Sequence, residues 1–193
     1  EGRRMGLTIL PPDINLSEWG YTGSRQAVRV GLMQIKSLQE DLASRIIVER
    51  QTNGPYRSLH DMLDRVKPEI AQATLLIKAG CFDSITGELT RPALLWRLFA
   101  SQAAKTPGYL PIPAEYSLQQ KLHHELELFG FPLSCHPLEL FTDILARIPH
   151  IPAKDLAQHV GEQVTVIGWL VTEKIISTKK GEPMEFITLE DQT

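Results

Sequence analysis

The spacing of apolar residues changes once along this chain, and that change limits its fold more than any other feature. As far as about residue 150, apolar residues recur every three or four positions, as Leu38, Leu42 and Ile46 do, which is typical of amphipathic helices. From Val164 onward the period becomes two, which is typical of strands. The sequence therefore predicts a mainly α fold that is followed by a β segment.

Residues that cap or stop helices divide the helical part into segments. They are the stops Asn53-Gly54-Pro55 and Gly80 and the N-terminal caps Ser58, Thr90 and Ser117. Between the helices that Thr90 and Ser117 cap, residues 105–113 contain three prolines, which forbid regular helix and favour extended chain. A shorter helix is predicted after Pro137, and residues 178–181 are predicted to form the tip of a β-hairpin.

Charge is distributed unevenly over the 193 residues. The formal net charge of −3 argues weakly against nucleic-acid binding. Between residues 25 and 57, however, six cations face three carboxylates, whereas between residues 115 and 163 three cations face seven carboxylates. This asymmetry predicts that only the first third of the chain contacts phosphate.

The segment from Ile35 to Gln39 is the first candidate binding site. A tight hairpin between two helices exposes backbone amides at the start of the second helix, where the helix dipole also favours an anion such as a DNA phosphate. Arg29, Lys36 and Arg45 would add positive charge. Such an arrangement reads no bases, so the binding would be sequence-independent. An ordinary packed helical hairpin would explain the same residues, and the pattern alone leaves both interpretations open.

The β segment contains a second candidate site. Trp169 could stack on a base, with Lys174, Lys179 and Lys180 along the path of the nucleic-acid backbone. The alternative is a buried tryptophan and a solvated lysine turn.

Several sequence strings resemble, in order, parts of the bacterial DNA polymerase III alpha subunits. Residues 31–36, 53–59 and 76–83 resemble the tandem helix-hairpin-helix region of that family. Residues 3–15 resemble the end of its fingers region, residues 125–138 its connector, and residues 164–193 the first strands of its OB domain. The resemblance covers essentially the whole chain.

The resemblance implies four segments. The end of the fingers region would occupy residues 1–27, and a tandem helix-hairpin-helix DNA-binding domain residues 28–88. A helical connector would follow over residues 89–155, and a truncated OB-fold domain would begin at residue 156 and run to residue 193. Both ends of the sequence look cut, so we expect a piece excised from a longer protein.

The resemblance also implies a function. The expected role is a non-catalytic, DNA-binding segment of a DNA-directed DNA polymerase that acts in replication or translesion synthesis in the cytoplasm. Its partners would be duplex DNA, a single-stranded template and other polymerase III or mutasome subunits. The parent would use two Mg²⁺ ions held outside this segment, which itself needs no cofactor. The alternatives are a structural or protein-binding scaffold without DNA contact, or a helix-hairpin-helix module of a DNA-repair protein.

The chain departs from the family pattern at two positions. Ser37 and Gln39 stand where the first hairpin of the family has glycines, which allow positive φ angles and a close approach to phosphate. A sliding-clamp peptide is also missing, because the nearest string, residues 72–76, lacks an aromatic residue and lies within a predicted helix. The missing clamp peptide and the sequence of residues 91–96 make the chain more similar to the error-prone branch of the polymerase family than to the main replicase.

No catalytic or metal-binding residues are predicted in this segment. The histidines around residues 123–150 lack the spacing of a zinc half-site. Glu125 and Glu127 lie two apart on a helix and point to different faces, so they make a poor acid–base pair. Cys81 and Cys135 are expected to be buried, reduced thiols. No apolar run approaches the roughly 20 residues that cross a bilayer.

Overall fold

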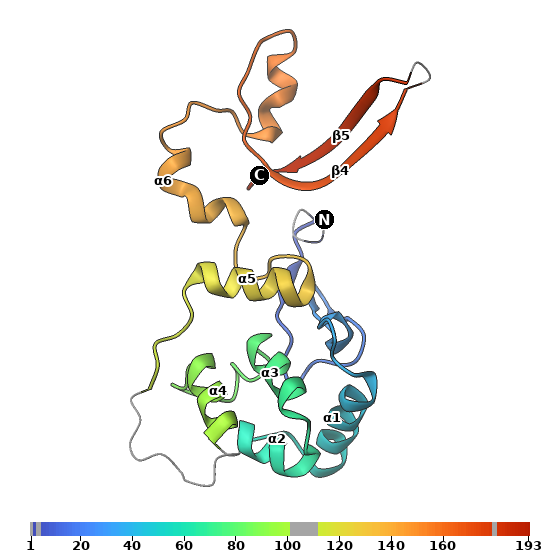
Figure 1. Cartoon of the computed structure of the whole chain (residues 1–193), viewed down its shortest axis with the longest axis vertical. Coiled ribbons are helices and arrows are strands. Elements are labelled where there is room, and N and C mark those ends of the chain that lie inside the picture. The colour runs from blue at the N-terminus through green and yellow to red at the C-terminus, as the bar shows by residue number, and fades with distance from the viewer. Residues whose placement is uncertain (1, 3–4, 101–111, 179–180) are drawn as a thin grey trace. The chain divides into compact units, whose positions relative to one another are not determined.

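The structure is a computed structural model that describes residues 2, 5–100, 112–178 and 181–193. The chain divides into two compact units, residues 1–134 and residues 135–193. Helices dominate the first unit, and the longest strands of the described residues lie in the second (Figure 1). The predicted mainly α fold with a β segment near its C-terminal end is therefore confirmed.

A small sheet opens the first unit. Its strands β1 (Thr8–Leu10), β2 (Thr22–Ser24) and β3 (Ala27–Arg29) lie in the order β1-β3-β2. β1 pairs with β3 in parallel, and β2 pairs with β3 antiparallel. Directly after β3, the chain enters the core with Val30, which is completely buried.

The predicted caps begin three helices of the first unit, and the predicted stops at Gly54 and Gly80 end two of them. These elements are η1 (Leu32–Gln34), α1 (Glu40–Asn53), α2 (Leu59–Val66), α3 (Ile70–Lys78), α4 (Arg91–Ala100) and α5 (Leu118–Phe129). The Ser58 hydroxyl accepts a hydrogen bond from the Asp61 amide, and the Thr90 hydroxyl accepts one from the Ala93 amide. Ser117 forms a reciprocal capping box that begins α5.

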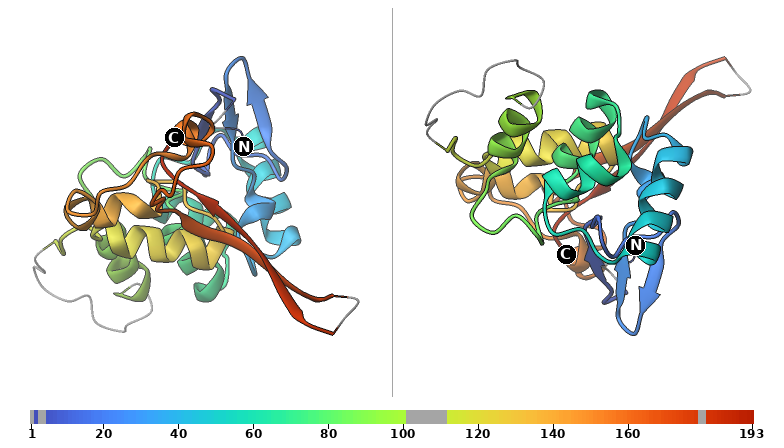
Figure 2. Two further views of the ribbon diagram at one scale, coloured as in Figure 1. Left: turned by 90° about the horizontal axis from the view of Figure 1, so that it is seen from above. Right: turned by 90° about the horizontal axis from the view of Figure 1, so that it is seen from below.

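One hydrophobic core joins all these helices. α1 packs against α2 and α3 packs against α4, while α5 lies across the end of this cluster (Figures 1 and 2). Completely buried side chains come from segments far apart in the sequence and include Ile14, Leu32, Leu42, Ile46, Met62, Leu76, Ile77 and Phe82. Within the described ranges, no helix combines the length and apolarity that a membrane crossing requires.

A buried arginine fixes the corner between α3 and α4. α3 ends in a Schellman motif, in which Gly80 has φ +81° and the Cys81 amide donates to the Leu76 carbonyl at 3.0 Å. The Arg91 guanidinium lies against this turn, donates to the Lys78 carbonyl at 3.1 Å and pairs with Asp83 at 2.6 Å. A Cβ atom on Gly80 would lie 2.2 Å from Nη2 of Arg91.

A buried carboxylate shapes the chain after α5. Glu125 is 5% exposed and accepts hydrogen bonds from the Leu133 amide at 2.6 Å and the Ser134 amide at 2.9 Å. The Ser134 hydroxyl donates to the same carboxylate. Because these bonds occupy both its oxygens, Glu125 has a structural role, whereas Glu127 is exposed.

The second unit contains short helical turns followed by a β-hairpin. Its elements are η2 (Pro137–Phe141), α6 (Thr142–Leu145), η3 (Ala153–His159), β4 (Trp169–Ser177) and β5 (Pro183–Glu190). The strand predicted from Val164 begins only at Trp169, because Trp169 pairs with the last residue of β5, Glu190. Before that point the Thr165 carbonyl accepts a hydrogen bond from the Ile151 amide instead.

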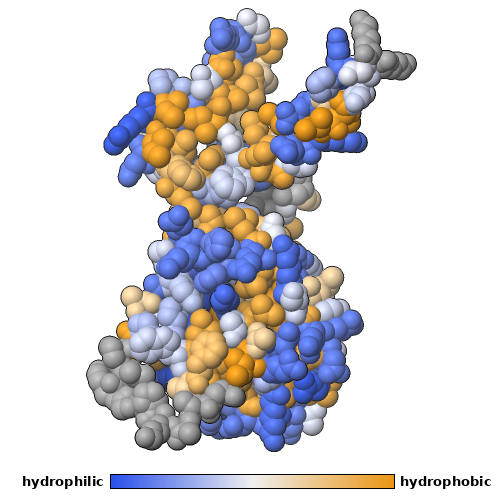
Figure 3. All heavy atoms as spheres, viewed as in Figure 1, coloured by the Kyte–Doolittle hydropathy of each residue, from blue (hydrophilic) through white to orange (hydrophobic). Residues whose placement is uncertain are grey.

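Apolar side chains are exposed on both faces of the β4–β5 hairpin. Ile175, Phe186 and Ile187 are 68%, 55% and 56% exposed. Figure 3 shows hydrophobic side chains along this hairpin. Among the described residues, the sheet that β4 and β5 form has two strands. A two-stranded hairpin of this kind gains little stability by itself in water.

The corner at Gly80 provides a test of the fold. We expect Gly80→Ala to lower the free energy of unfolding by about 3 kcal/mol, because the new Cβ must adopt a positive φ and must also displace the Arg91 guanidinium. Gly87→Ala is the matched control, since Gly87 also has a positive φ, +59°, but nothing lies within 4 Å of its Cβ position. In urea titrations, Gly87→Ala should lower the free energy of unfolding by only about 1 kcal/mol. Equal losses in the two variants would contradict the close Arg91 contact.

Candidate nucleic-acid interface

The hairpin between η1 and α1 projects polar side chains from a buried base. Ile35 and Leu38 are 2% and 8% exposed and belong to the core. Lys36, Ser37 and Gln39, three of the predicted binding residues, are all exposed. The structure therefore brings these three together on one turn at the surface.

The two helical hairpins of the first unit share one backbone geometry. In the first hairpin Ser37 has φ +65°, two residues before Gln39, the N-terminal cap of α1. In the second hairpin Lys67 has φ +50°, two residues before Glu69, the N-terminal cap of α3. Each turn thus places one left-handed residue before an extended cap, so the two turns resemble each other.

Only one of the two substituted glycine positions requires a left-handed backbone. Ser37 has a positive φ, whereas Gln39 has φ −73° and ψ 131°, which any residue adopts easily. Backbone strain from the missing glycines is therefore confined to Ser37.

Hydrogen bonds from distant elements hold the first hairpin. The Lys36 amide donates to the Leu128 carbonyl of α5 at 2.8 Å. The Gln39 amide donates to Oε1 of Gln72 at 2.9 Å, and Nε2 of Gln72 donates to the Ser37 carbonyl at 3.0 Å. These bonds fix the turn from two sides.

Several backbone amides remain available at the mouth of this hairpin. Among the described residues, the amides of Ser37, Glu40, Asp41 and Leu42 have no hydrogen-bond partner. Leu42 is buried, so the amides of the three exposed residues are the ones open to a ligand. Amides of this kind at a helix N-terminus are suited to an anion such as phosphate.

The charges around the hairpin nearly cancel. Lys36 is exposed at its tip, but the exposed carboxylates of Glu40 and Asp41 lie in the first turn of α1. Arg45 pairs with Asp41 at 3.3 Å, and it also donates to the Val66 carbonyl at 2.9 Å. The predicted phosphate contact by Arg45 would therefore have to compete with two existing bonds.

Two other cations of the basic segment are engaged in the fold. Arg50 is 7% exposed, donates to the Ile14 carbonyl and pairs with Glu18 at 2.8 Å. Arg29 lies on β3 and donates to the Pro11 carbonyl at 2.9 Å. The local excess of cations between residues 25 and 57 thus overstates the charge that is free to meet DNA.

In the second unit, the β-hairpin places two of the predicted residues on one face. Trp169 pairs with Glu190 and Lys174 pairs with Phe186, and the positions of these partners on β5 differ by an even number. Trp169, Lys174 and Phe186 therefore share a face, despite the irregularity between Leu170 and Thr172. Lys179 and Lys180 lie outside the described residues.

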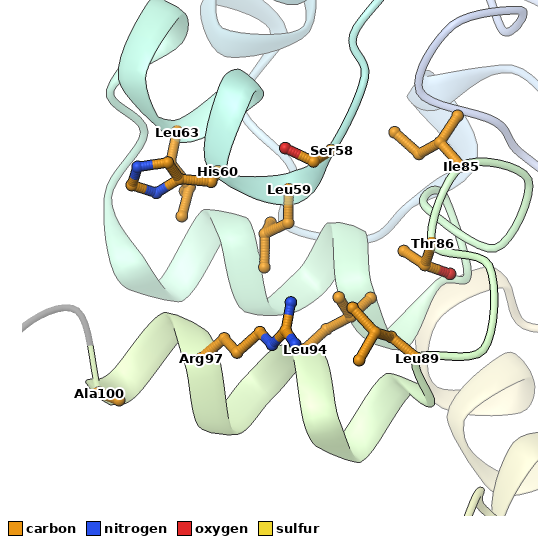
Figure 4. A pocket seen from close by; sticks show the side chains of 10 residues that line it. All are labelled: Ser58, Leu59, His60, Leu63, Ile85, Thr86, Leu89, Leu94, Arg97 and Ala100. Carbon is orange, nitrogen blue, oxygen red and sulfur yellow. The ribbon is translucent and has the colours of Figure 1, made fainter. Parts of the chain in front are cut away.

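The remaining candidate groups are metal-ligating side chains, two cysteines and one pocket. Within the described ranges, no three His, Cys, Asp or Glu residues come close enough to hold a metal ion. Cys81 and Cys135 are both buried, and burial raises the pKa of the Cys81 thiol, so this thiol is a poor nucleophile. A pocket of about 550 Å³ between α2 and α4 is lined mainly by apolar side chains such as Leu59, Leu63 and Leu94 (Figure 4).

Sequence reasoning missed the part that Gln72 plays at this interface. Residues 72–76 were interpreted only as helix core, because they lack the pattern of a clamp peptide. Gln72 is indeed buried, but its carboxamide contacts the hairpin. The sequence did contain a signal: Gln72 lies beside Ala73 and Leu76 on the apolar face of a predicted helix. A polar side chain buried on such a face needs hydrogen-bond partners from another element.

Comparison with known proteins adds independent information. The family profile described as helix-hairpin-helix motif matches residues 6–93. The chain is 30% identical to the DNA polymerase III subunit alpha of Treponema pallidum and 30% identical to that of Aquifex aeolicus. It is 31% identical to the error-prone DNA polymerase of Nocardia farcinica. These alignments cover 99% or 100% of the chain, which spans 17% or 18% of the length of each relative.

The left-handed serine of the first hairpin can be tested by restoring glycine. We expect Ser37→Gly to raise the free energy of unfolding by about 1 kcal/mol, because glycine adopts φ +65° without strain. Ser24→Gly in strand β2 is the control and should lower stability in the same urea titration, since that serine has no positive φ. A loss of stability in Ser37→Gly would show that the turn does not need a left-handed residue.

Proposed function

Because this chain is homologous along its whole length to one segment of the bacterial DNA polymerase III alpha subunits and error-prone DNA polymerases, we propose that it is a non-catalytic, DNA-binding segment of such a polymerase. Its contacts would be sequence-independent and would involve phosphates of the duplex or the template strand during replication or translesion synthesis. The contact residues would be those predicted at the first hairpin.

The geometry of the first hairpin is the observation that carries this proposal. A left-handed residue, Ser37, turns the chain so that its own amide and the unpaired amides of α1 lie at one exposed turn. Lys36 adds a cation there. Backbone amides and a lysine bind phosphate without reading base edges, as a polymerase that copies any sequence requires.

The activity of the whole protein follows as part of the proposal. The parent would be a DNA-directed DNA polymerase that extends a primer with deoxynucleotides in the cytoplasm, with other polymerase III or mutasome subunits as partners. Two Mg²⁺ ions would assist phosphoryl transfer in that parent. Because the described residues of this chain offer no carboxylate cluster to hold them, we place those ions in other segments of the parent.

The β-hairpin is proposed as a second, single-strand contact. Trp169 and Phe186 are 37% and 55% exposed, and they share a face with Lys174. Exposed aromatic rings beside a cation can stack on successive bases while the cation meets the backbone. We propose that Lys179 and Lys180 extend this path.

A scaffold without DNA contact is the second candidate function. The exposed carboxylates of Glu40 and Asp41, in the turn that would face phosphate, favour it. Like charges at this position weaken any phosphate contact. A module of a DNA-repair protein is a third candidate, but the family resemblance outside the helix-hairpin-helix region favours the polymerase.

Salt-dependent DNA binding tests the proposal directly. We expect the 193-residue chain to bind labelled duplex DNA in fluorescence anisotropy, with an affinity that falls log-linearly as salt rises. Lys36→Ala should weaken binding and reduce the slope by about one, because one phosphate contact is lost. Lys154→Ala, an exposed lysine of the second unit, is the control and should change neither quantity. An absence of binding at low salt would favour the scaffold.

The carboxylates of the hairpin provide a test of opposite sign. We expect Glu40→Gln to raise the DNA affinity roughly two-fold at low salt, because it removes a negative charge near the phosphate. Glu88→Gln removes another exposed carboxylate, one that follows α3 and is outside the hairpin, and should have no effect in the same titration. An identical response of the two variants would place the DNA elsewhere.

A further inference from the structure

The carboxamide of Gln72 is a buried polar group with an unusual pair of partners. Gln72 lies on α3 and is 8% exposed. Its Oε1 accepts from the Gln39 amide at 2.9 Å, and its Nε2 donates to the Ser37 carbonyl at 3.0 Å. Both ends of one side chain are therefore used to hold one turn of a different helical hairpin.

These two bonds act on both sides of Leu38. The Ser37 carbonyl precedes Leu38 and the Gln39 amide follows it, so the carboxamide restrains two successive peptide planes. Ser37 lies in a left-handed conformation that a non-glycine residue leaves readily when it is not held. Gln72 thus keeps Ser37 in a left-handed conformation that glycine would adopt without strain.

The second hairpin receives a similar support from the first. Arg45 of α1 donates to the Val66 carbonyl, directly before the left-handed Lys67. Each hairpin is therefore held by a side chain from the second helix of the other. Of these two side chains, Gln72 bonds to both sides of its turn, whereas Arg45 bonds to one carbonyl.

We propose that Gln72 is a positioning residue for phosphate binding, an inference that rests on the proposed function. Its carboxamide holds the first hairpin in the shape in which the Ser37 amide and the first amides of α1 meet one phosphate. It also occupies the Gln39 amide, so that DNA contacts the remaining donors. Gln72 itself does not touch DNA.

The chemistry of the carboxamide determines which variants are informative. Methionine has a similar length but neither the donor nor the acceptor of an amide, so Gln72→Met removes both bonds at little cost in packing. An ionised carboxylate accepts but cannot donate, so Gln72→Glu keeps the bond from Gln39 and opposes the Ser37 carbonyl. When that carboxyl is protonated it can donate again, and the original pair of bonds can return.

The test measures binding of labelled duplex DNA to the 193-residue chain and these variants. We expect Gln72→Met to bind about five- to ten-fold more weakly, because less of the protein has the competent hairpin. The salt slope should stay that of the wild type, since no cation is removed. Gln51→Met, which alters an exposed glutamine of α1, is the matched control and should bind as the wild type does.

A pH profile of binding, measured beside circular dichroism at each pH, separates positioning from a general loss of stability, because circular dichroism reports unfolding directly. Relative to the wild type, Gln72→Glu should be weak at about pH 8 and should approach wild-type affinity near about pH 5, as the introduced carboxyl becomes protonated. Amide exchange followed by NMR should show a protected Gln39 amide in the wild type and a loss of that protection in Gln72→Met. If Gln72→Met fails to fold, the pH profile of Gln72→Glu decides the question alone.

The outcomes distinguish this inference from the proposed function. A wild-type chain that does not bind DNA at low salt would overturn both. A wild-type chain that binds DNA, together with Gln72 variants that bind equally well at every pH, would overturn the positioning role alone. Unchanged protection of the Gln39 amide in Gln72→Met would also overturn it.

Discussion

The hydrogen bonds that hold the hairpin from Ile35 to Gln39 are the constraint on which the candidate interface depends. Their partners come from α3 and α5, which follow the hairpin by more than 30 and about 90 residues. Peptide groups that leave water must find partners, so the turn can take this shape only when those helices are in place. The hairpin is therefore a product of the whole first unit and not a local motif.

Local signals in the sequence accounted for most helix boundaries. Ser58, Thr90 and Ser117 each cap a helix through their own hydroxyl groups, which depends only on the next few residues. The strands β1 and β2 went unnoticed because three residues carry too little alternation. The start of β4 was placed too early because it depends on where β5 ends, which no pattern within β4 records.

The interface was harder to predict than the fold. The sequence predicted that Lys36, Ser37 and Gln39 lie together on an exposed turn, because a turn between two apolar periods has to lie at the surface; their contact with DNA stays a prediction. It could not show that Arg50 is buried against Glu18, since counting charges along a segment does not reveal which are neutralised. It also could not show Gln72 as a partner of the hairpin, because that contact joins two helices across the core.

Under the proposed function, the near-cancellation of charge at the hairpin has a kinetic consequence. A strongly basic surface would bind phosphate tightly. Because affinity differences between related complexes lie mostly in the dissociation rate, each such contact would last a long time. One lysine, offset by Glu40 and Asp41, would instead give contacts of short lifetime. In the proposed polymerase, contacts that break quickly would suit a duplex that has to advance by one base pair after every nucleotide is added.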